Sequence, residues 1–499
     1  EQDEVIRAEL PGVLAVQGGP GTGKTAIGLH RAAYLLYNHP ELARSGVLVV
    51  GPNRIFLRYI AQVLPSLGEE AVVQVALADL VPGVKTTVRD GFETQRAKGD
   101  ARMAQVLARA VAARRTRVVD DLAVHVGLRR VVVRAADIDK LVTSLAARGA
   151  PYRSGRAALK TNMVRLVDLA ARLAGAGDGI DRGFLTRELA RQPQFGAAID
   201  LAWPAVSAKA LLTELLASPV RITEAAEGIL SDAEQVALLR GSGKGFSQAD
   251  LPLLDELHDL LAGNTHTYGH IVVDEAQDLT PMQLRMLGRR CPGGSVTVLG
   301  DLAQATGPWS PSNWEEVVAH LPQPSGWRQS ELTLGYRAPG QVLDFASRLL
   351  REAAPGVPAT TAVRPGRTAP FVLEVAPSDL LPAAVAEASR LSADGRSVGL
   401  IVADEDAKEA ERFVRDVRTG DGSAIGLAER DGLRMPITLV GALAAKGLEF
   451  DSVVIVEPAR IAGSTTRGLR LLYVALTRPI QHLSIVHSAP IPALLREPA

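Results

Sequence analysis

A glycine-rich segment near the start of the sequence has the residue types and the spacing of a phosphate-binding loop. It matches the pattern G-x-x-x-x-G-K-[ST] with the residues Gly18, Gly19, Pro20, Gly21, Thr22, Gly23, Lys24 and Thr25. Glycines let backbone N–H groups come close to a phosphate, and the lysine can reach the β- and γ-phosphates of a nucleotide. The Thr25 hydroxyl is a ligand of the kind that Mg²⁺ takes. The pattern therefore predicts binding of a nucleoside triphosphate with Mg²⁺.

The residues around this loop predict the elements that would hold it in place. The apolar run from Val13 to Gly18 predicts a short buried strand, the segment 25–39 a helix, and the segment 45–53 a second strand. A strand, a helix and a strand in this order are typical of a parallel sheet. The helix would start at the phosphate, where its N-terminal N–H groups favour an anion.

A pair of acidic residues follows another apolar strand far downstream. Asp274 and Glu275 come directly after the apolar residues Ile271 to Val273. An isolated Asp-Glu pair is usually solvated surface, but in a chain with a phosphate-binding loop it predicts the second half of a nucleotide site. Asp274 would hold Mg²⁺ through water, and Glu275 would polarise an attacking water. We therefore expect hydrolysis of a nucleoside triphosphate, with ATP and Mg²⁺ as the bound groups.

The apolar pattern divides the 499-residue chain into four segments. Residues 1–76 and 264–335 are expected to form two parts of a first α/β domain, whose last strand falls at 331–337. Residues 77–263 predict a large, mostly helical insertion, interrupted by the run Val131 to Val133, because a structureless loop of that length is implausible. Residues 336–499 predict a second α/β domain, and the Pro- and Gly-rich stretch 354–370 predicts a linker or loop near its boundary.

The charge is zero overall but uneven along the chain. Lys and Arg number 55, as do Asp and Glu, which argues against a uniformly basic nucleic-acid binder. The segment 85–160, however, has 17 basic against 7 acidic residues. This patch suits a nucleic-acid site or an acidic protein channel, or it consists of solvated helix faces. One cysteine and the lack of an apolar run of about 20 residues predict a cytoplasmic protein without a membrane span.

Six motifs in order resemble those of superfamily-one helicases of the UvrD type. They are the phosphate-binding loop and the residues 274–278 (DEAQD), 300–304 (GDLAQ), 336–337 (YR), 446–451 (KGLEFD) and 473–478 (YVALTR). The resemblance implies an α/β fold of two RecA-like P-loop NTPase lobes, with ATP bound between them and the helical insertion in the first lobe.

The resemblance also implies residues that contact the nucleotide. Gln2 would read the adenine, Tyr336 would stack on the base, and Glu449 would contact the ribose. All three lie outside the phosphate-binding loop itself.

Three further residues are implied to act in catalysis together with Lys24 and Glu275. They are Gln304, which would sense the γ-phosphate, and the arginine fingers Arg337 and Arg478. Physical reasoning agrees about the arginines, because a loose phosphoryl transition state needs cationic donors. An arginine that arrives from a second lobe would make hydrolysis depend on closure.

Two segments differ from the helicases that grip single-stranded DNA. The stretch 305–311 keeps one aromatic residue, Trp309, but lacks the usual following basic residue, and Asn53 and Arg54 stand where a Thr-Asn-Lys motif is usual. Trp309 would either stack on a base, worth about 1–3 kcal/mol, or belong to a core or an interface. Trp309, Asn53 and Arg54 are therefore candidate nucleic-acid contacts.

Three segments are similar to the actinobacterial HelD family, whose members are helicase-like factors that bind bacterial RNA polymerase. They are GPNRIFLRYIAQVLPSLGE, YGHIVVDEAQDLTPMQLRMLGRRCP and AKGLEFDSVVIVEPARI. The similarity implies a protein that binds RNA polymerase core, opens its clamp and releases it from DNA and RNA, with ATP turnover aiding recycling. The insertion would enter the main channel. Because the family also carries an N-terminal coiled coil, we expect that the sequence is a fragment or that part of the chain is not represented in it.

Two alternative functions stay open at the level of sequence. The first is an autonomous ATP-dependent 3′–5′ DNA helicase or translocase of the UvrD type, for which the motif order is sufficient. The second is a polymerase-binding factor in which ATP is only a switch and occupation of the polymerase channel does the work. The identity of the partner distinguishes the helicase from the two polymerase-binding functions. The need for ATP hydrolysis distinguishes those two from each other.

Overall fold

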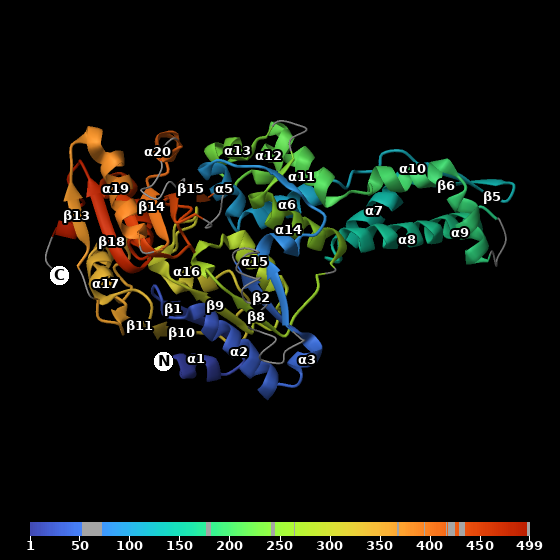
Figure 1. The fold of residues 1–499 in the computed structure, drawn as a ribbon. Coiled ribbons are helices and arrows are strands. Elements are labelled where there is room, and N and C mark those ends of the chain that lie inside the picture. The colour runs from blue at the N-terminus through green and yellow to red at the C-terminus, as the bar shows by residue number, and fades with distance from the viewer. Residues whose placement is uncertain are drawn as a thin grey trace. The chain divides into compact units, whose positions relative to one another are not determined.

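The computed structural model describes residues 1–51, 72–175, 181–240, 245–263, 265–366, 369–393, 395–415, 417, 425–428 and 435–496 (Figure 1). The chain divides into two compact units. The first is formed by Glu1–Leu77 together with Thr267–Ala499, and the second by Ala78–His266. The first unit is therefore made from two stretches that are far apart in the sequence.

The first sheet of the first unit has six parallel strands in the order β10-β1-β9-β8-β2-β3. Their bounds are β1 Val13–Gly18, β2 Val47–Gly51, β3 Val72–Ala76, β8 His270–Val273, β9 Val296–Gly300 and β10 Trp327–Leu332. The strand predicted at Val13–Gly18 is confirmed, and every residue of β1, β2, β8 and β9 is buried. Burial on both faces explains why these strands are apolar runs without alternation.

Short helices connect and cover this sheet. They are α1 Gln2–Arg7, α2 Lys24–Asn38, α3 Leu42–Ser45, α15 Pro281–Arg289 and α16 Trp314–Val318, with 3₁₀ turns at Leu77–Leu80, Ala276–Asp278 and Leu302–Gln304. The predicted helix 25–39 is thus confirmed as α2, which starts one residue earlier. In parallel strands the carboxyl ends share one edge, so β1, β8 and β9 bring their following loops together there.

The strand expected at 331–337 is wrong in position. β10 begins at Trp327 and ends at Leu332, and the chain then leaves the sheet, because Thr333 gives its N–H and its hydroxyl to the carboxylate of Glu1. Two residues further on, β11 (Leu334–Gly335) pairs with β12 (Thr361–Ala362). The stretch 354–370, expected to be a linker or loop, therefore contains a strand.

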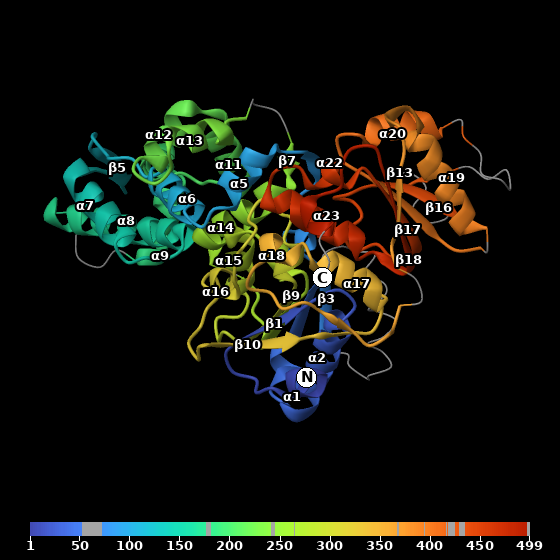
Figure 2. The same cartoon turned by 90° about the vertical axis from the view of Figure 1, so that its left-hand side faces the viewer.

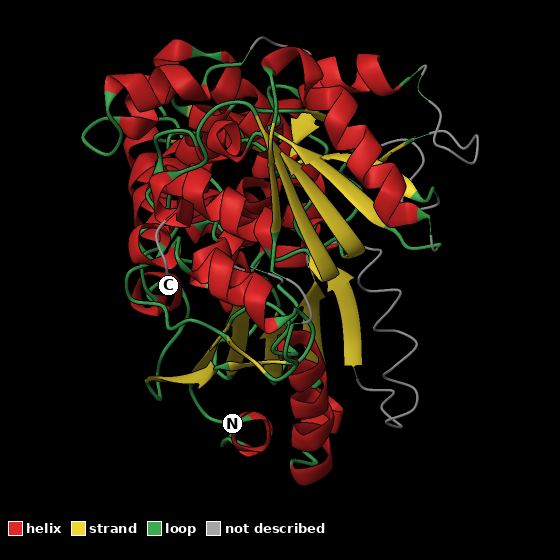
Figure 3. Cartoon of the chain, turned by 60° about the vertical axis from the view of Figure 1, so that its left-hand side comes forward, coloured by secondary structure: helices red, strands yellow, loops and turns green. Residues whose placement is uncertain are grey.

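The second sheet of the first unit is also parallel, in the order β13-β18-β17-β14-β16-β15. Its strands are β13 Phe371–Glu374, β14 Val398–Val402, β15 Gly426–Leu427, β16 Ile437–Gly441, β17 Phe450–Val456 and β18 Pro479–His487. Figure 3 shows the strands of both sheets in yellow. The five strands expected after Arg337 are all present in this sheet, and β15 is an additional short one.

Two layers of helices cover the second sheet (Figure 2). Residues of α19 (Leu380–Ser392) and α20 (Ala407–Val414) form one apolar cluster with the sheet. Residues of α17 (Gly340–Ser347), α18 (Leu350–Ala353), α22 (Pro458–Ala462), α23 (Thr466–Leu476) and α24 (Ala493–Arg496) form another. A 3₁₀ turn at Pro377–Asp379 precedes α19. The unit is thus mixed α/β with parallel sheets.

The second unit is mostly helical. Its helices are α5 Phe92–Gly99, α6 Met103–Ala112, α7 Ala135–Ala146, α8 Tyr152–Leu173, α9 Arg182–Ala190, α10 Pro193–Ala202, α11 Ala208–Ala217, α12 Pro219–Ala226, α13 Asp232–Leu238 and α14 Leu251–Ala262, with a 3₁₀ turn at Gln248–Asp250. The single Val-rich interruption predicted at Val131 to Val133 is part of a larger feature. β5 (Leu122–Val126) and β6 (Arg129–Val133) form an antiparallel hairpin, whose turn contains Gly127 with φ 59°.

A buried ion cluster joins the two ends of the second unit. Lys98 is fully buried, and its Nζ lies 2.7 Å from Asp90 Oδ2 and 2.8 Å from Asp250 Oδ1. Arg240 contacts Asp250 Oδ2 at 2.6 Å. Nearby, β4 (Thr86–Val88) pairs with β7 (Phe246–Ser247). Because these partners are about 150 residues apart in the chain, the cluster and the strand pair close the unit on itself.

The basic excess of the segment 85–160 is largely balanced within its own unit. The stretch Ala78–His266 contains 26 Lys and Arg against 22 Asp and Glu. Several of the arginines pair with acidic residues from later helices, as Arg102 does with Glu234, Arg114 with Glu214, and Arg156 with Asp200. Part of the positive charge of the segment is therefore neutralised by ion pairs within the second unit.

A buried histidine in the first sheet predicts sensitivity of the fold to acid. His270 of β8 is fully buried between the hydroxyls of Ser295 (2.8 Å) and Thr297 (3.2 Å). Burial, followed by the charge of Arg31, lowers the pKa of His270 from 6.5 to about 3. Between these values the unfolded chain binds a proton that the folded chain does not. The free energy of unfolding therefore falls as the pH drops below 6.5, by about 1.4 kcal/mol per pH unit.

We expect that His270→Gln loses less stability than the wild type between pH 7.5 and pH 5.0, by about 2 kcal/mol, because glutamine takes up no proton. Thermal unfolding at the two pH values measures this difference. His30→Gln, which replaces an exposed histidine of α2, is the matched control. An equal loss of stability in His270→Gln and the wild type would contradict the assignment.

Candidate functional site

The phosphate-binding loop connects β1 to α2 at the carboxyl edge of the first sheet. Gly23 has φ 81°, a left-handed conformation that favours glycine, and α2 begins at the next residue. Lys24 Nζ donates to the carbonyl oxygens of Gly18 (2.7 Å) and Gly19 (3.1 Å), so the ammonium lies over the loop. The loop residues thus surround a cation at the start of a helix, which is the arrangement that binds phosphate.

Gly19 is in close contact with a residue that the sequence did not single out. A Cβ atom at Gly19 would lie 1.7 Å from the Oγ1 atom of Thr360, which is buried. A Cβ atom at Gly335 would also meet Thr360 and the carbonyl oxygen of Pro20. Thr360 stands just before β12, in the stretch expected to be a linker or loop. The missing side chain of Gly19 therefore lets this stretch pack directly on the loop.

Thr25 and Asp274, the two residues predicted to hold Mg²⁺, are in contact. The Thr25 hydroxyl donates to Asp274 Oδ2 at 2.5 Å. A hydroxyl and a carboxylate side by side are oxygen groups of the kind that Mg²⁺ takes, either directly or through a bound water. The two side chains therefore fit the ion. Burial, and then the charge of Glu275, raises the pKa of Asp274, which a divalent cation would oppose.

Glu275 has a strained backbone and several cationic neighbours. Its φ is 54° and its ψ is 37°, a left-handed conformation that a non-glycine residue rarely adopts. Its carboxylate accepts a hydrogen bond from Gln277 Nε2 at 2.6 Å. Burial opposes ionisation of Glu275, but the charges of Lys446 and Lys24 and the bond from Gln277 outweigh it and lower the pKa. Glu275 is therefore ionised near neutral pH and able to accept a proton.

Asp301, which follows β9, joins the groups of the site. Its Oδ1 accepts from Gln17 Nε2 at 2.9 Å, and its Oδ2 accepts from Gln304 Nε2 at 2.8 Å. Its backbone N–H donates to Gln277 Oε1 at 3.1 Å, and Gln277 in turn donates to Glu275. The buried carboxylate of Asp301 thus sets the orientation of the Gln304 amide, and the backbone N–H of the same residue holds the amide of Gln277.

Arg478 comes from the second sheet and reaches this network. It stands between α23 and β18, is buried, and donates from Nη2 to Gln304 Oε1 at 3.2 Å. Its Nε donates to the carbonyl oxygen of Val474 at 2.9 Å. Burial lowers the pKa of Arg478, and the charge of Glu275 opposes this shift. Gln304 and Arg478, both predicted from the sequence, are therefore in contact.

Lys446, from the loop between β16 and β17, makes a second link between the two sheets. Its ammonium donates to the carboxylate of Asp278 and to the carbonyl oxygen of Gln304. It also lies 4.0 Å from Glu275 Oε2. The sequence analysis placed Lys446 in a motif but gave it no role, although a lysine in an otherwise apolar segment is a usable signal.

The predicted nucleotide contacts outside the loop lie close to it. Gln2 Nε2 donates to the carbonyl oxygen of Thr22 at 3.1 Å, and the N–H of Tyr336 donates to the carbonyl oxygen of Gly21 at 3.0 Å. The Tyr336 side chain is 47% exposed, so its ring is free to meet a base.

Arg337 and Glu449 form an ion pair with each other. Half of the Arg337 side chain and 37% of the Glu449 side chain are exposed. The structure therefore places a predicted arginine finger and a predicted ribose contact side by side.

The candidate nucleic-acid residues are only partly described. Asn53 and Arg54 lie outside the described residues. Trp309 is half-buried, in a loop whose carbonyl oxygens at Ala305 and Thr306 accept from Arg470 and Arg467 of α23. The loop has no basic residue of its own after Trp309, but two arginines of α23 contact it. These arginines are more than 150 residues away in the chain, so the sequence did not reveal the contact.

Gln17 is a further residue that the sequence analysis missed. It is the one polar side chain in the apolar strand β1, which was the available signal. It donates to Asp301, and its Oε1 accepts from the N–H of Leu302 (3.2 Å) and from Trp314 Nε1 (3.1 Å). Gln17 therefore holds Asp301 at Oδ1, the carboxylate oxygen that does not accept from Gln304.

Replacing Gln17 by leucine should lower the kcat of ATP hydrolysis about 10-fold or more and leave the KM for ATP almost unchanged. The physical reason is that Asp301 and Gln304 lose their alignment, whereas the phosphate-binding loop is not altered. Steady-state kinetics measure both constants. Gln329→Leu, on the exposed edge of the neighbouring strand β10, is the control. A change in KM with an unchanged kcat would rule out the positioning role.

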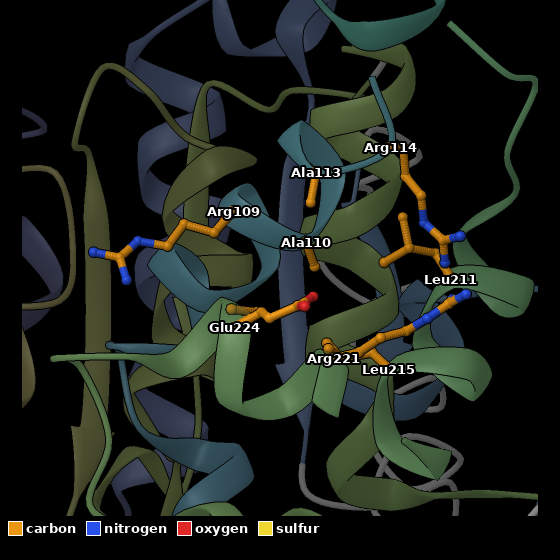
Figure 4. A pocket seen from close by; sticks show the side chains of 9 residues that line it. Arg109, Ala110, Ala113, Arg114, Leu211, Leu215, Arg221 and Glu224 are labelled. Carbon is orange, nitrogen blue, oxygen red and sulfur yellow. The ribbon is translucent and has the colours of Figure 1, made fainter. Parts of the chain in front are cut away.

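The second unit holds a cavity of about 180 Å³ lined mainly by residues of α6, α11 and α12 (Figure 4). Its floor contains Ala110, Leu211 and Leu215. Arg114 and Arg221 at its rim both pair with Glu214. Glu214 thus offsets part of the positive charge of these two arginines.

None of the helices within the described residues is long and apolar enough to cross a membrane. The same part of the chain has no group of three or more His, Cys, Asp or Glu side chains placed to hold a metal ion.

Known proteins similar to this chain are found among solved structures. No family model matches the chain, and no curated protein matches it. Among solved structures, the chain is similar to the C-terminal domain of a possible DNA helicase from Lactobacillus plantarum WCFS1. That likeness covers 32% of this chain and 92% of the other, with 18% sequence identity and a TM-score of 0.26.

Proposed function

We propose that the protein is an ATPase of the helicase type, built from two RecA-like lobes that each contain one of the two parallel sheets. The observation that carries the proposal is the contact between Arg478 and Gln304. It brings a buried arginine of the second sheet to the network that also holds Glu275. A phosphate-binding loop with a glutamate and an arginine from a second element is the set of groups that phosphoryl transfer requires.

Each group has a defined part in the proposed reaction. Lys24 binds the β- and γ-phosphates. Thr25, and Asp274 through water, would hold Mg²⁺, which would supply positive charge for the phosphate oxygens. Glu275 orients a water and takes its proton as the water oxygen bonds to the γ-phosphorus. The bond between that phosphorus and the β,γ-bridging oxygen breaks, and ADP leaves with the electron pair. Arg478 and Gln304 stabilise the charge that develops on the γ-phosphoryl group.

The proposed partner is bacterial RNA polymerase core, which the protein would open at its clamp and release from DNA and RNA. Support comes from the three segments that are similar to the HelD family. It also comes from the altered stretch after Gln304, where the helicases that grip DNA carry more aromatic and basic residues. DNA or RNA would then be contacted mainly as part of the polymerase complex.

A pull-down from bacterial lysate, with and without nuclease, tests the partner. RNA polymerase should be recovered equally in both arms, and the purified protein should then release labelled DNA from a stalled polymerase complex when ATP is present. Recovery that disappears with nuclease, together with robust strand separation by the pure protein on a partial duplex, would instead establish an autonomous DNA helicase or translocase.

A further inference from the structure

The buried arginine Arg31 of α2 uses its hydrogen bonds to hold the start of the chain. Only 1% of its side chain is exposed. Its Nη1 and Nη2 atoms donate to the backbone carbonyl oxygens of Val5 (3.1 Å), Ile6 (3.2 Å), Ala8 (2.6 Å) and Glu9 (2.9 Å). Its Nε donates to Thr297 Oγ1 at 2.9 Å. The guanidinium thus connects residues 5–9 to the first sheet.

These bonds act at the C-terminal end of α1 (Gln2–Arg7). The last carbonyl groups of a helix have no partner within it, and Arg31 supplies donors for those of Val5 and Ile6. Figure 1 shows α1 lying beside α2. One buried side chain therefore fixes residues 5–9, in addition to the contact of Glu1 with Thr333.

The segment held in this way carries Gln2. Its amide is anchored on the carbonyl oxygen of Thr22, and its Nε2 lies 3.6 Å from the position that a Cβ atom of Gly23 would take. Tyr336 is attached to the same loop at Gly21. A nucleotide whose phosphates lie in the loop has its base within reach of an amide and an aromatic ring.

The chemistry of the Gln2 amide selects one class of base. An amide offers one donor group and one acceptor, which match the N7 acceptor and the N6 donor of adenine. Guanine presents two acceptors, N7 and O6, on the same edge. Selectivity then requires that the amide stays in one place, because a side chain that can move would meet either base.

We infer that Arg31 is a positioning residue that sets the selectivity of the site for adenine over guanine nucleotides, because it holds residues 5–9 and so keeps Gln2 on the phosphate-binding loop. The inference rests on the proposed function, since it requires a nucleoside triphosphate in that loop. Arg31 itself touches neither the base nor the phosphates. Burial lowers its pKa to about 10, so it stays cationic at neutral pH.

The kinetics of ATP and GTP hydrolysis by wild type, Arg31→Lys and Gln2→Ala test the inference. Lysine keeps the charge but has one nitrogen instead of three, so it cannot satisfy the same carbonyl groups. We expect the wild type to prefer ATP. The ratio of the two kcat/KM values should fall about 10-fold or more in both variants, since a bidentate base contact is worth about 1–3 kcal/mol. The double variant should be no less selective than Gln2→Ala.

In both variants the KM for ATP should rise, whereas kcat at saturating ATP should stay almost unaltered. A merely structural role would lower the rates with ATP and GTP equally and leave the ratio intact, which would overturn the inference. So would a wild type that uses both nucleotides equally. Thermal unfolding checks that Arg31→Lys is folded, and Thr297→Val, which removes the acceptor of Arg31 Nε, is the milder variant if it is not.

The proposed function and the inference fail in different ways. If the wild type hydrolyses neither nucleotide, the proposed ATPase activity is wrong. If the wild type prefers ATP and Gln2→Ala loses that preference while Arg31→Lys and Thr297→Val both keep it, the ATPase stands and Arg31 has no part in selectivity.

Discussion

Lys24→Ala should reduce ATP turnover by at least about 100-fold, the cost of removing one preorganised donor to a charged transition state. Lys24 Nζ lies over the carbonyl oxygens of Gly18 and Gly19, at the N-terminus of α2. A phosphate bound there would lie against the Lys24 ammonium, whose positive charge would stabilise it. Alanine keeps the helix and the loop but removes the cation. Release of inorganic phosphate measures the rate, and a fluorescent ATP analogue measures binding, which should also weaken.

Lys408→Ala is the matched control, because Lys408 is an exposed lysine of α20 in the same unit. It should retain the wild-type rate. Thermal unfolding should give similar midpoints for the wild type and both variants. A Lys24→Ala protein that is folded and hydrolyses ATP at the wild-type rate would show that the phosphate-binding loop is not the nucleotide site.

Glu275→Gln should slow hydrolysis by about 10²- to 10⁴-fold and leave ATP binding nearly intact, since a positioned base contributes a factor of that size. Glutamine has almost the same shape and accepts the hydrogen bond from Gln277 through its own oxygen, but it cannot take a proton. The contrast with Lys24→Ala is informative, because only the lysine variant should lose affinity. Single-turnover hydrolysis separates the chemical step from product release.

Glu275→Gln also shows whether release of RNA polymerase requires ATP hydrolysis or only ATP binding. If ATP is used only by binding, Glu275→Gln should release RNA polymerase from DNA as well as the wild type over repeated cycles. If hydrolysis is needed, it should complete at most the first cycle. Glu409→Gln, an exposed glutamate of α20, should behave as the wild type. Hydrolysis by Glu275→Gln at the wild-type rate would assign the base elsewhere.

The fold was most predictable where strands are buried on both faces. The runs at Val13 and Ile271 are apolar except for Gln17, so local sequence and tertiary environment agree. Prediction failed at β10, an edge strand whose residues 327–331 are mostly polar or charged and alternate in exposure. Such a strand exists because β1 offers it a ladder of hydrogen bonds, which its own residues do not reveal.

The candidate site shows the same division. Asp274 was identified from its place after an apolar strand, and Gln304 from the resemblance to helicase motifs. Gln17 and Arg31 were not, because each acts on chain segments about 20 to 300 residues away. Thr360 was missed for the same reason, since its stretch has the composition of a loop and packs on Gly19 only after the first unit has folded.

The sequence by itself determined which groups could hold a phosphate and a divalent cation, because the spacing from Gly18 to Thr25 and the order of strand and carboxylate at Asp274 are local properties. Only the tertiary structure decided that Arg478 meets Gln304, that Lys446 meets Asp278, and that Arg31 holds the segment carrying Gln2. These contacts form when the two sheets of the first unit and their connecting segments pack together. In each contact, hydrogen bonds offset the cost of taking charged groups out of water. This pairing depends on the three-dimensional arrangement of distant residues and leaves no periodic signal in the chain.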